Sequence, residues 1–369
     1  MKTRVSDMFG IDLPIFAFSH CRDVVAAVSK AGGLGVLGAL AFSPDQLEIE
    51  LQWIDEHVDG KPYGVDVVMP AKYAGAGELD PDHMAEQLGE MIPQQHREWL
   101  DKLLAEYDVP ELPEEEHSEG LLGWVHEKAR EQVEIALGHP IKLLVNALGP
   151  PPKDVIDLAH EHDVKVAALC GAVAQAERHA ALGVDVIVAQ GTEAGGHTGD
   201  VASLVLWPDV VDAVAPTPVL AAGGIGDGRQ MAAALALGCE GVWTGSIWLT
   251  TAESDSGPLV MEKLLAAGAR DTVRSSSWTG KPARMLRTEW TEAWERDDSP
   301  GTLAMPLQYM LISDAQRRIA KYQVEELTTM PVGQIVGRMN RVRPVRDVVF
   351  DLVEEFVDAS QRLEKLVEE

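Results

Sequence analysis

A single histidine stands among glycines in the segment VAQGTEAGGHTGD, which spans residues 188–200 and follows an apolar run. The imidazole of His197 titrates near neutral pH, which suits it to accept or donate a proton. Gly195 and Gly196 leave room for a flat ligand beside the main chain, and Gln190 offers both a carbonyl and an amide to a heterocycle edge. The alternative is a histidine bonded to neighbouring main chain, but the glycine setting favours an acid–base role for His197.

Paired small residues recur at two later points of the chain. The string AAGGIGDGR places Gly223 and Gly224 ahead of an expected helix, and WTGS places Gly245 and Ser246 ahead of another helical turn. Such residues let backbone N–H groups approach an anion closely, and a helix N-terminus favours negative charge. Tight turns without a ligand are the alternative at either position alone. Together the two pairs predict a phosphorylated cofactor or substrate.

Three further residues are candidates to face the same ligand. Ala17 and Phe18 end an apolar run near the N-terminus, and Asp66 interrupts another such run. A buried carboxylate needs a partner, so Asp66 is expected either to accept from a ligand N–H or to make a structural hydrogen bond. Glu193 is expected to bond loop N–H groups rather than to react. Cys21 lacks the partners of a nucleophile and is interpreted as a packing residue.

Eight short apolar runs, alternating with helical patterns, must position these residues. Runs that are apolar on both faces are typical of a parallel sheet covered by helices. Eight such units in a row favour a closed (β/α)8 TIM barrel of the α/β class over an open sheet, with the active site at the strand C-terminal ends. The expected strands lie at 14–18, 34–39, 63–69, 141–147, 165–170, 184–190, 218–224 and 241–246.

Two segments fall outside the repeating units. Residues 70–140 form an acidic, mostly helical insertion after the third strand, expected over the barrel mouth as a solvated decoration or as a lid or substrate wall. Residues 284–369 form a helical extension, expected on the outside of the barrel, over its mouth or against another subunit of a homo-oligomer. Residues 1–283, insertion included, are the predicted barrel domain.

The charge balance and the cysteines argue against several classes of function. The chain of 369 residues carries 31 Lys and Arg against 59 Asp and Glu, a formal charge of -28, which disfavours nucleic-acid and anionic-membrane partners. The cysteines, three and scattered, suit a reducing compartment and lack metal-ligand spacing. No signal peptide and no membrane-spanning run is seen. We therefore expect a cytoplasmic protein without a metal site.

The strings AQGTEAGGHTG, PVLAAGGIGDGR and GVWTGSIWLTTAES together resemble the nitronate monooxygenase family of FMN-dependent barrel enzymes. The similarity covers most of the chain outside 70–140. It implies FMN as the cofactor and His197 as the catalytic base. The cofactor contacts that it implies are Gln190, Gly195 and Gly196 at the flavin, Gly223, Gly224, Gly245 and Ser246 at its phosphate, and Ala17, Phe18 and Asp66 at the isoalloxazine.

Two departures from the family pattern leave the substrate open. The family most often has Asn where Asp66 stands, which changes the polarity of that flavin contact. The segment PIFAFSHCRD replaces a proline–methionine–alanine–glycine type sequence after the first strand, beside the flavin.

The family reaction oxidises an alkyl nitronate with O2 to a carbonyl compound and nitrite. In that reaction His197 would deprotonate a nitroalkane or, charged, steady the anionic nitronate. The same string is found in NAD(P)H-linked reductases of enoyl thioesters and quinones, where His197 would be the proton donor. A flavin-free barrel that binds a phosphorylated metabolite, as a sensor or isomerase, is a third interpretation. In each case the ligand is a small molecule.

Overall fold

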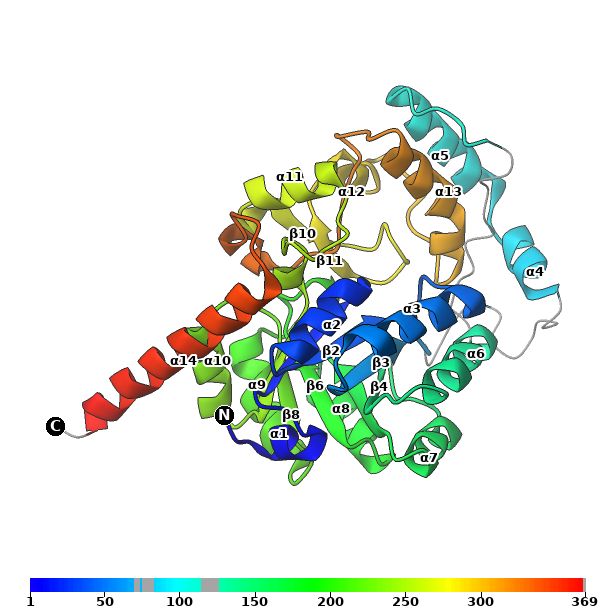
Figure 1. Ribbon diagram of the computed structural model, residues 1–369. Coiled ribbons are helices and arrows are strands. Elements are labelled where there is room, and N and C mark those ends of the chain that lie inside the picture. The colour runs from blue at the N-terminus through cyan, green and yellow to red at the C-terminus, as the bar shows by residue number, and fades with distance from the viewer. Residues whose placement is uncertain (70–73, 75–82, 114–125, 368–369) are drawn as a thin grey trace.

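A computed structural model describes residues 1–69, 74, 83–113 and 126–367. Eight parallel strands close into a barrel in the order β1-β2-β3-β4-β5-β6-β8-β9 (Figure 1). The strands are β1 (Ile15–Ser19), β2 (Leu34–Gly38), β3 (Tyr63–Val67), β4 (Leu143–Asn146), β5 (Lys165–Cys170), β6 (Val186–Gln190), β8 (Val219–Ala222) and β9 (Gly241–Thr244). Each lies within or next to a run of the sequence expected to be a strand, so the predicted barrel is confirmed.

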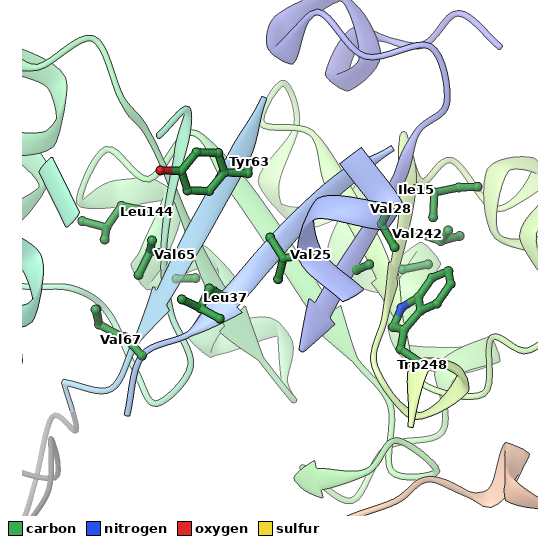
Figure 2. Close-up of a cluster of buried hydrophobic side chains, with 14 of the residues drawn as sticks. Ile15, Val25, Val28, Leu37, Tyr63, Val65, Val67, Leu144, Val242 and Trp248 are labelled. Atoms are coloured by element: carbon green, nitrogen blue, oxygen red, sulfur yellow. The ribbon is translucent and has the colours of Figure 1, made fainter. Parts of the chain in front are cut away.

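Successive residues of each strand face either the barrel interior or the surrounding helices, as the two-residue period of a strand requires. Phe16 of β1 lies in the interior cluster, whereas Ile15 and Ala17 pack in the outer layer between strands and helices. Figure 2 shows that outer layer around β3, including Val65 and Val67. Burying one such aliphatic side chain contributes about 1.5–3 kcal/mol. The apolar runs therefore form strands because both of their faces are covered.

Helices surround the barrel, and one of them comes from the far end of the chain. The longest, α14, packs against α10 and α2, between the seventh strand's helix and the first strand's helix. It thus completes the ring as the eighth helix. The ring helices are α2 (Arg22–Lys30), α3 (Pro44–His57), α6 (His126–Leu137), α7 (Lys153–Glu161), α8 (Val173–Ala181), α9 (Ser203–Val214), α10 (Gly228–Ala236) and α14 (Val345–Val367). No helix within the described ranges is long and apolar enough to cross a membrane.

A short helix at the N-terminus covers one end of the barrel interior. Helix α1 (Arg4–Phe9) places Val5 and Phe9 in the interior cluster, and the Phe9 ring meets Phe16 edge-on at 5.4 Å. This contact fills the end opposite the strand C-termini. The remaining, open end is the mouth where the candidate residues gather.

A small antiparallel sheet, which the sequence analysis did not predict, lies beside the mouth. It pairs β10 (Thr272–Ser275), β11 (Ala283–Leu286) and β7 (Gly196–His197) in the order β10-β11-β7. The expected boundary between residues 283 and 284 falls inside β11, so the C-terminal region begins in a strand, not in helices. Because β7 contains His197, this sheet determines where the histidine sits.

The predicted insertion divides into two parts. Helix α6 packs on α3 and β3 as a ring helix. Helices α4 (Met84–Glu90) and α5 (Gln94–Glu106) instead pack against α12 (Glu289–Ala293) and α13 (Leu307–Lys321). The rest of the insertion, 70–73, 75–82 and 114–125, lies outside the described residues. Helices α4 and α5 therefore share a second core with the C-terminal region, and their role as a lid or substrate wall stays a prediction.

The C-terminal region also reaches the mouth. At the N-terminal end of α13, Met305 and Tyr309 pack against Val68, which follows β3, and the Ala74 N–H donates to Met305 O at 2.8 Å. The remaining elements are α11 (Pro258–Ala266) and the 3-10 helices η3 (Ser246–Trp248), η4 (Ala269–Asp271) and η5 (Gln334–Arg338).

Candidate active site

His197 lies at the barrel mouth on β7, where it pairs with Ala283 of β11. Its Nε2 is 2.7 Å from Oγ1 of Thr279. Surrounding protein removes water from the ring, and this desolvation, together with the nearby charge of Lys281, lowers the pKa of His197 to about 4. The imidazole is therefore uncharged at neutral pH and can accept a proton there.

Thr279 and Lys281 belong to the loop 276–282 between β10 and β11, and the sequence analysis missed both. Thr279 is fully buried, and Lys281 is half-buried. Gly280 between them has a φ of +79°, and a Cβ there would lie 1.8 Å from Leu303 O, so only glycine fits. The glycine within SSSWTGKPAR was the available signal, but nothing local connects it to a histidine more than eighty residues earlier.

Of the two residues predicted on the first strand, Phe18 and Ala17, only Phe18 turns its side chain toward the mouth. The Phe18 ring points into the barrel, 5.1 Å from the His20 ring and 6.3 Å from the Trp243 ring. The Ala17 side chain points the other way, into the outer layer. Ala17 can therefore face a ligand only through its main chain.

Asp66 points into the barrel interior from β3 and is almost completely buried. Its Oδ1 has no hydrogen-bond partner among the described residues, and burial raises the pKa of the carboxyl well above its usual value. A buried oxygen without a partner costs free energy. The backbone of Ala147 bonds the carboxyl, in line with the structural expectation, and Oδ1 leaves the ligand contact open as well.

The glycine-rich loop after β6 is held by contacts from several elements. The Gln190 side-chain amide donates to Gly195 O at 3.2 Å, so this N–H group is already bonded within the loop. A Cβ on Gly195 would lie 2.8 Å from Gly333 N, so this glycine is required by packing. Gly196 has a φ of +74°. A Cβ added to it would have no described atom within 4 Å, so there is open space beside this glycine.

Glu193 plays the structural role expected of it. Its carboxylate accepts from the Ser203 N–H at 3.2 Å, at the start of α9. It lies beside Gly224, whose added Cβ would meet Glu193 Cγ at 3.2 Å. Both Gly223 and Gly224 have left-handed φ values, +98° and +71°, which larger residues adopt only with strain.

The helix after the first glycine pair does not offer its N–H groups as expected. Helix α10 does begin at Gly228, but the Asp227 side chain accepts from Gln230 N, and the Gln230 side chain accepts from Gly226 N and Asp227 N. Glu355 of α14 accepts from Gly228 N at 2.9 Å. These side chains occupy the helix N-terminus, so an anion near Gly223–Gly224 would not use it.

The second pair lies close to both the first strand and the C-terminal region. Ser246 Oγ accepts from Gly333 N at 2.9 Å. The one atom near a Cβ added to Gly245 is Phe18 Cδ1, at 3.9 Å. Gly245 thus lies against the same ring that lines the mouth.

The cysteines take no part in this arrangement. All three are free and buried, and burial raises the pKa of Cys170 and Cys239 to about 12. The Cys21 thiol donates to Glu253 O at 3.2 Å, and burial raises its pKa as well. The interpretation of Cys21 as a packing residue fits these surroundings.

A closed parallel barrel with a glycine-lined mouth and a histidine at the strand C-terminal ends has the architecture of a barrel enzyme. The sequence pattern of the family described as nitronate monooxygenase matches residues 2–355. The chain belongs to this family, and it is an oxidoreductase.

Individual relatives agree with the family assignment. Rv1533 of Mycobacterium tuberculosis, provisionally named a monooxygenase, is 56% identical, and the match covers 100% of both chains. The nitroalkane oxidase of Streptomyces ansochromogenes is 27% identical, with a TM-score of 0.80 over 97% of this chain and 99% of that one. FabK of Thermotoga maritima is 28% identical, with a TM-score of 0.76 over 99% of both chains. The protein is therefore similar along its whole length to enzymes with different names.

Proposed function

We propose that this protein is an FMN-dependent nitronate monooxygenase, which oxidises alkyl nitronates with O2 to a carbonyl compound and nitrite. The observation that carries the proposal is the uncharged imidazole of His197 at the barrel mouth, with its pKa held near 4. A neutral imidazole removes the α-proton of a nitroalkane, which turns it into the nitronate.

The residues at the mouth fit FMN. The unpartnered Oδ1 of Asp66 offers a buried polar contact to a ring N–H, and the space beside Gly196 and the Phe18 ring accommodates a flat aromatic group. Gly223, Gly224, Gly245 and Ser246 would hold the phosphate. When bound, FMN supplies the one- and two-electron chemistry that amino-acid side chains lack.

The chain's own residues have three tasks in this reaction. His197 takes the α-proton, Thr279 holds Nε2 of the imidazole, and the loop after β6 keeps the histidine beside the open space at Gly196. The reductase alternative asks His197 to donate a proton to its product, and so low a pKa leaves little of the ring in the doubly protonated form, which donates a proton most readily, at neutral pH. This difference favours the oxidative reaction.

Anaerobic reduction of the purified flavoprotein separates the two reactions. We expect ethylnitronate to bleach the flavin absorbance while NADH and NADPH do not. Bleaching by a pyridine nucleotide alone would establish the reductase instead. A preparation that stays colourless after addition of FMN would point to the flavin-free sensor or isomerase.

The role of His197 has its own test. We expect His197→Ala to keep FMN bound, as seen in its absorbance spectrum, and to lose turnover of nitroethane by about 100-fold or more, the usual size of general-base catalysis. Full activity in that variant would exclude the base assignment.

A further inference from the structure

A lysine beside the histidine has no counter-ion among the residues that the structure describes. Lys281 is half-buried, and no described carboxylate forms an ion pair with it. Burial lowers the pKa of its ammonium group, and that charge in turn contributes to the low pKa of His197. In a chain with a formal charge of -28, an unpaired half-buried ammonium group is unexpected. Such a charge is costly unless an anion accompanies it.

The loop that carries Lys281 is held in place. The backbone N–H of Lys281 donates to Thr279 Oγ1 at 3.3 Å, and the same oxygen is hydrogen-bonded to His197 Nε2. Gln308, fully buried in α13, donates to Ser277 O at 3.0 Å and accepts from Leu303 N at 2.9 Å. Because the loop is anchored to α13 and to both strands of its hairpin, the histidine, threonine and lysine form one fixed unit.

We propose that Lys281 is the anion-binding residue of the mouth, that it selects the nitronate anion over neutral substrates, and that Thr279 positions His197 for the neutral nitroalkane. This inference rests on the proposed function and assigns proton removal and anion binding to two different side chains. The imidazole removes a proton while uncharged, and the ammonium group holds the negative charge that results. The alternative from the sequence, an imidazolium that steadies the nitronate, then becomes unnecessary.

Nitroethane and ethylnitronate make a matched substrate pair, because they differ by one proton. We expect Lys281→Met to raise the KM for ethylnitronate by about tenfold or more, the effect of removing a buried charge partner. The KM for nitroethane should change by less than about twofold, and Lys281→Arg should restore nitronate binding. Equal changes in the two KM values, or no change in either, would overturn the proposal.

Anion binding is also measurable without turnover. We titrate the holoenzyme with nitrate, an unreactive planar anion, and follow the flavin absorbance and the heat of binding. Weaker binding of about tenfold in Lys281→Met supports the site, whereas unchanged affinity refutes it. If ethylnitronate proves not to be a substrate while nitrate still binds through Lys281, the proposed function fails and the anion site stands.

The positioning role of Thr279 requires an isosteric change. We expect Thr279→Val to lower kcat for nitroethane by about tenfold, within the range of general-base effects, with Thr279→Ser restoring most of it. Among the described residues, Lys281 is the charged group that acts on the pKa of His197. Arg284 of β11 pairs with Gly196 and with Arg274 of β10, and Glu193 and Asp200 lie on the histidine's own loop. None of these is altered by the threonine variants, so a changed acid limb in the pH profile would report on the imidazole itself. An unchanged kcat and pH profile in Thr279→Val would refute the role.

Discussion

Burial favours the uncharged form of two titratable groups at the barrel mouth. Desolvation lowers the pKa of His197 and raises the pKa of Asp66. Both residues stood out in the sequence by type and position, but their charge states depend on burial, which no local pattern reports. The ammonium group of Lys281 adds a positive charge beside His197, so the mouth suits a neutral aromatic ring together with an anion.

The pH dependence of turnover follows from the histidine. Because the pKa of His197 is about 4, we expect kcat/KM for nitroethane to have no acid limb between pH 8 and about 5, and to fall as pH approaches 4. Steady-state assays across this range measure it. An acid limb near pH 6.5, in protein shown by circular dichroism to stay folded, would mean that desolvation of the imidazole is much weaker.

The same histidine makes the fold sensitive to acid. In the unfolded chain this imidazole binds a proton below about pH 6.5, whereas in the native protein it does so only near pH 4. The free energy of unfolding therefore falls as pH drops through this window. We expect His197→Gln to lack this contribution. Urea unfolding of both proteins at pH 7 and pH 5 measures the difference, and identical losses in the two would contradict it.

Asp66 gives the opposite dependence. Its pKa is raised in the folded state, so folding takes up a proton and stability falls as pH rises above about 3.8. We expect Asp66→Asn to raise Tm at pH 7, by about 2–4 °C per kcal/mol gained, and the gain to shrink toward pH 4. Thermal unfolding without added flavin tests this. A gain that does not vary with pH would show that the carboxyl is not the cause.

At the scale of elements, the sequence sufficed where a strand is buried on both faces. The run at 184–190 and its seven counterparts were recognisable because length and apolar character together exclude a helix. The sheet of β7, β10 and β11 was not, because a two-residue strand such as β7 exists only through pairing with β11, far along the chain. The part of the site that depends on this sheet, Thr279 and Lys281, was missed with it.

Two glycines test how strictly the loop between β10 and β11 is fixed. Gly280 and Gly301 share nearly the same φ, +79° and +78°, but only Gly280 is packed, against Leu303 O. We expect Gly280→Ala to displace Thr279 and lower kcat for nitroethane about tenfold or more. Gly301→Ala should cost only the left-handed strain of about 1–2 kcal/mol, with kcat retained. Equal kcat in both variants would show that the loop tolerates displacement.

At the scale of the whole molecule, the hydrophobic core outside the barrel crosses the apparent domain order of the chain. Leu88 and Trp99 of the insertion share a core with Trp290 and Ile312 of the C-terminal region. The sequence marked both segments as departures from the barrel but could not show that they pack together, because amphipathic helices do not specify their partner. The division at residues 283 and 284 therefore separates segments that the structure joins.

The seam between the two ends of the barrel's helical ring is tight. A Cβ on Gly228 of α10 would lie 2.2 Å from Leu352 O and 2.3 Å from Phe356 N, both in the main chain of α14. We expect Gly228→Ala to cost about 1–3 kcal/mol, as overpacking does. Gly257→Ala, at the start of α11 with no atom within 4 Å, should stay within about 0.5 kcal/mol of the parent. Urea unfolding compares them, and equal stabilities would show that α14 shifts freely.

The origin of α14 at residues 345–367 has a consequence for synthesis. The last barrel strand ends at Thr244, so a ribosome working at about 5–20 residues per second adds the rest of the ring about 6–25 s later. Throughout that interval the apolar flanks of α10 and α2 have no cover. The nascent barrel therefore stays partly exposed until α14 has been synthesised. A truncated chain without α14 would keep this apolar surface exposed to chaperones and proteases.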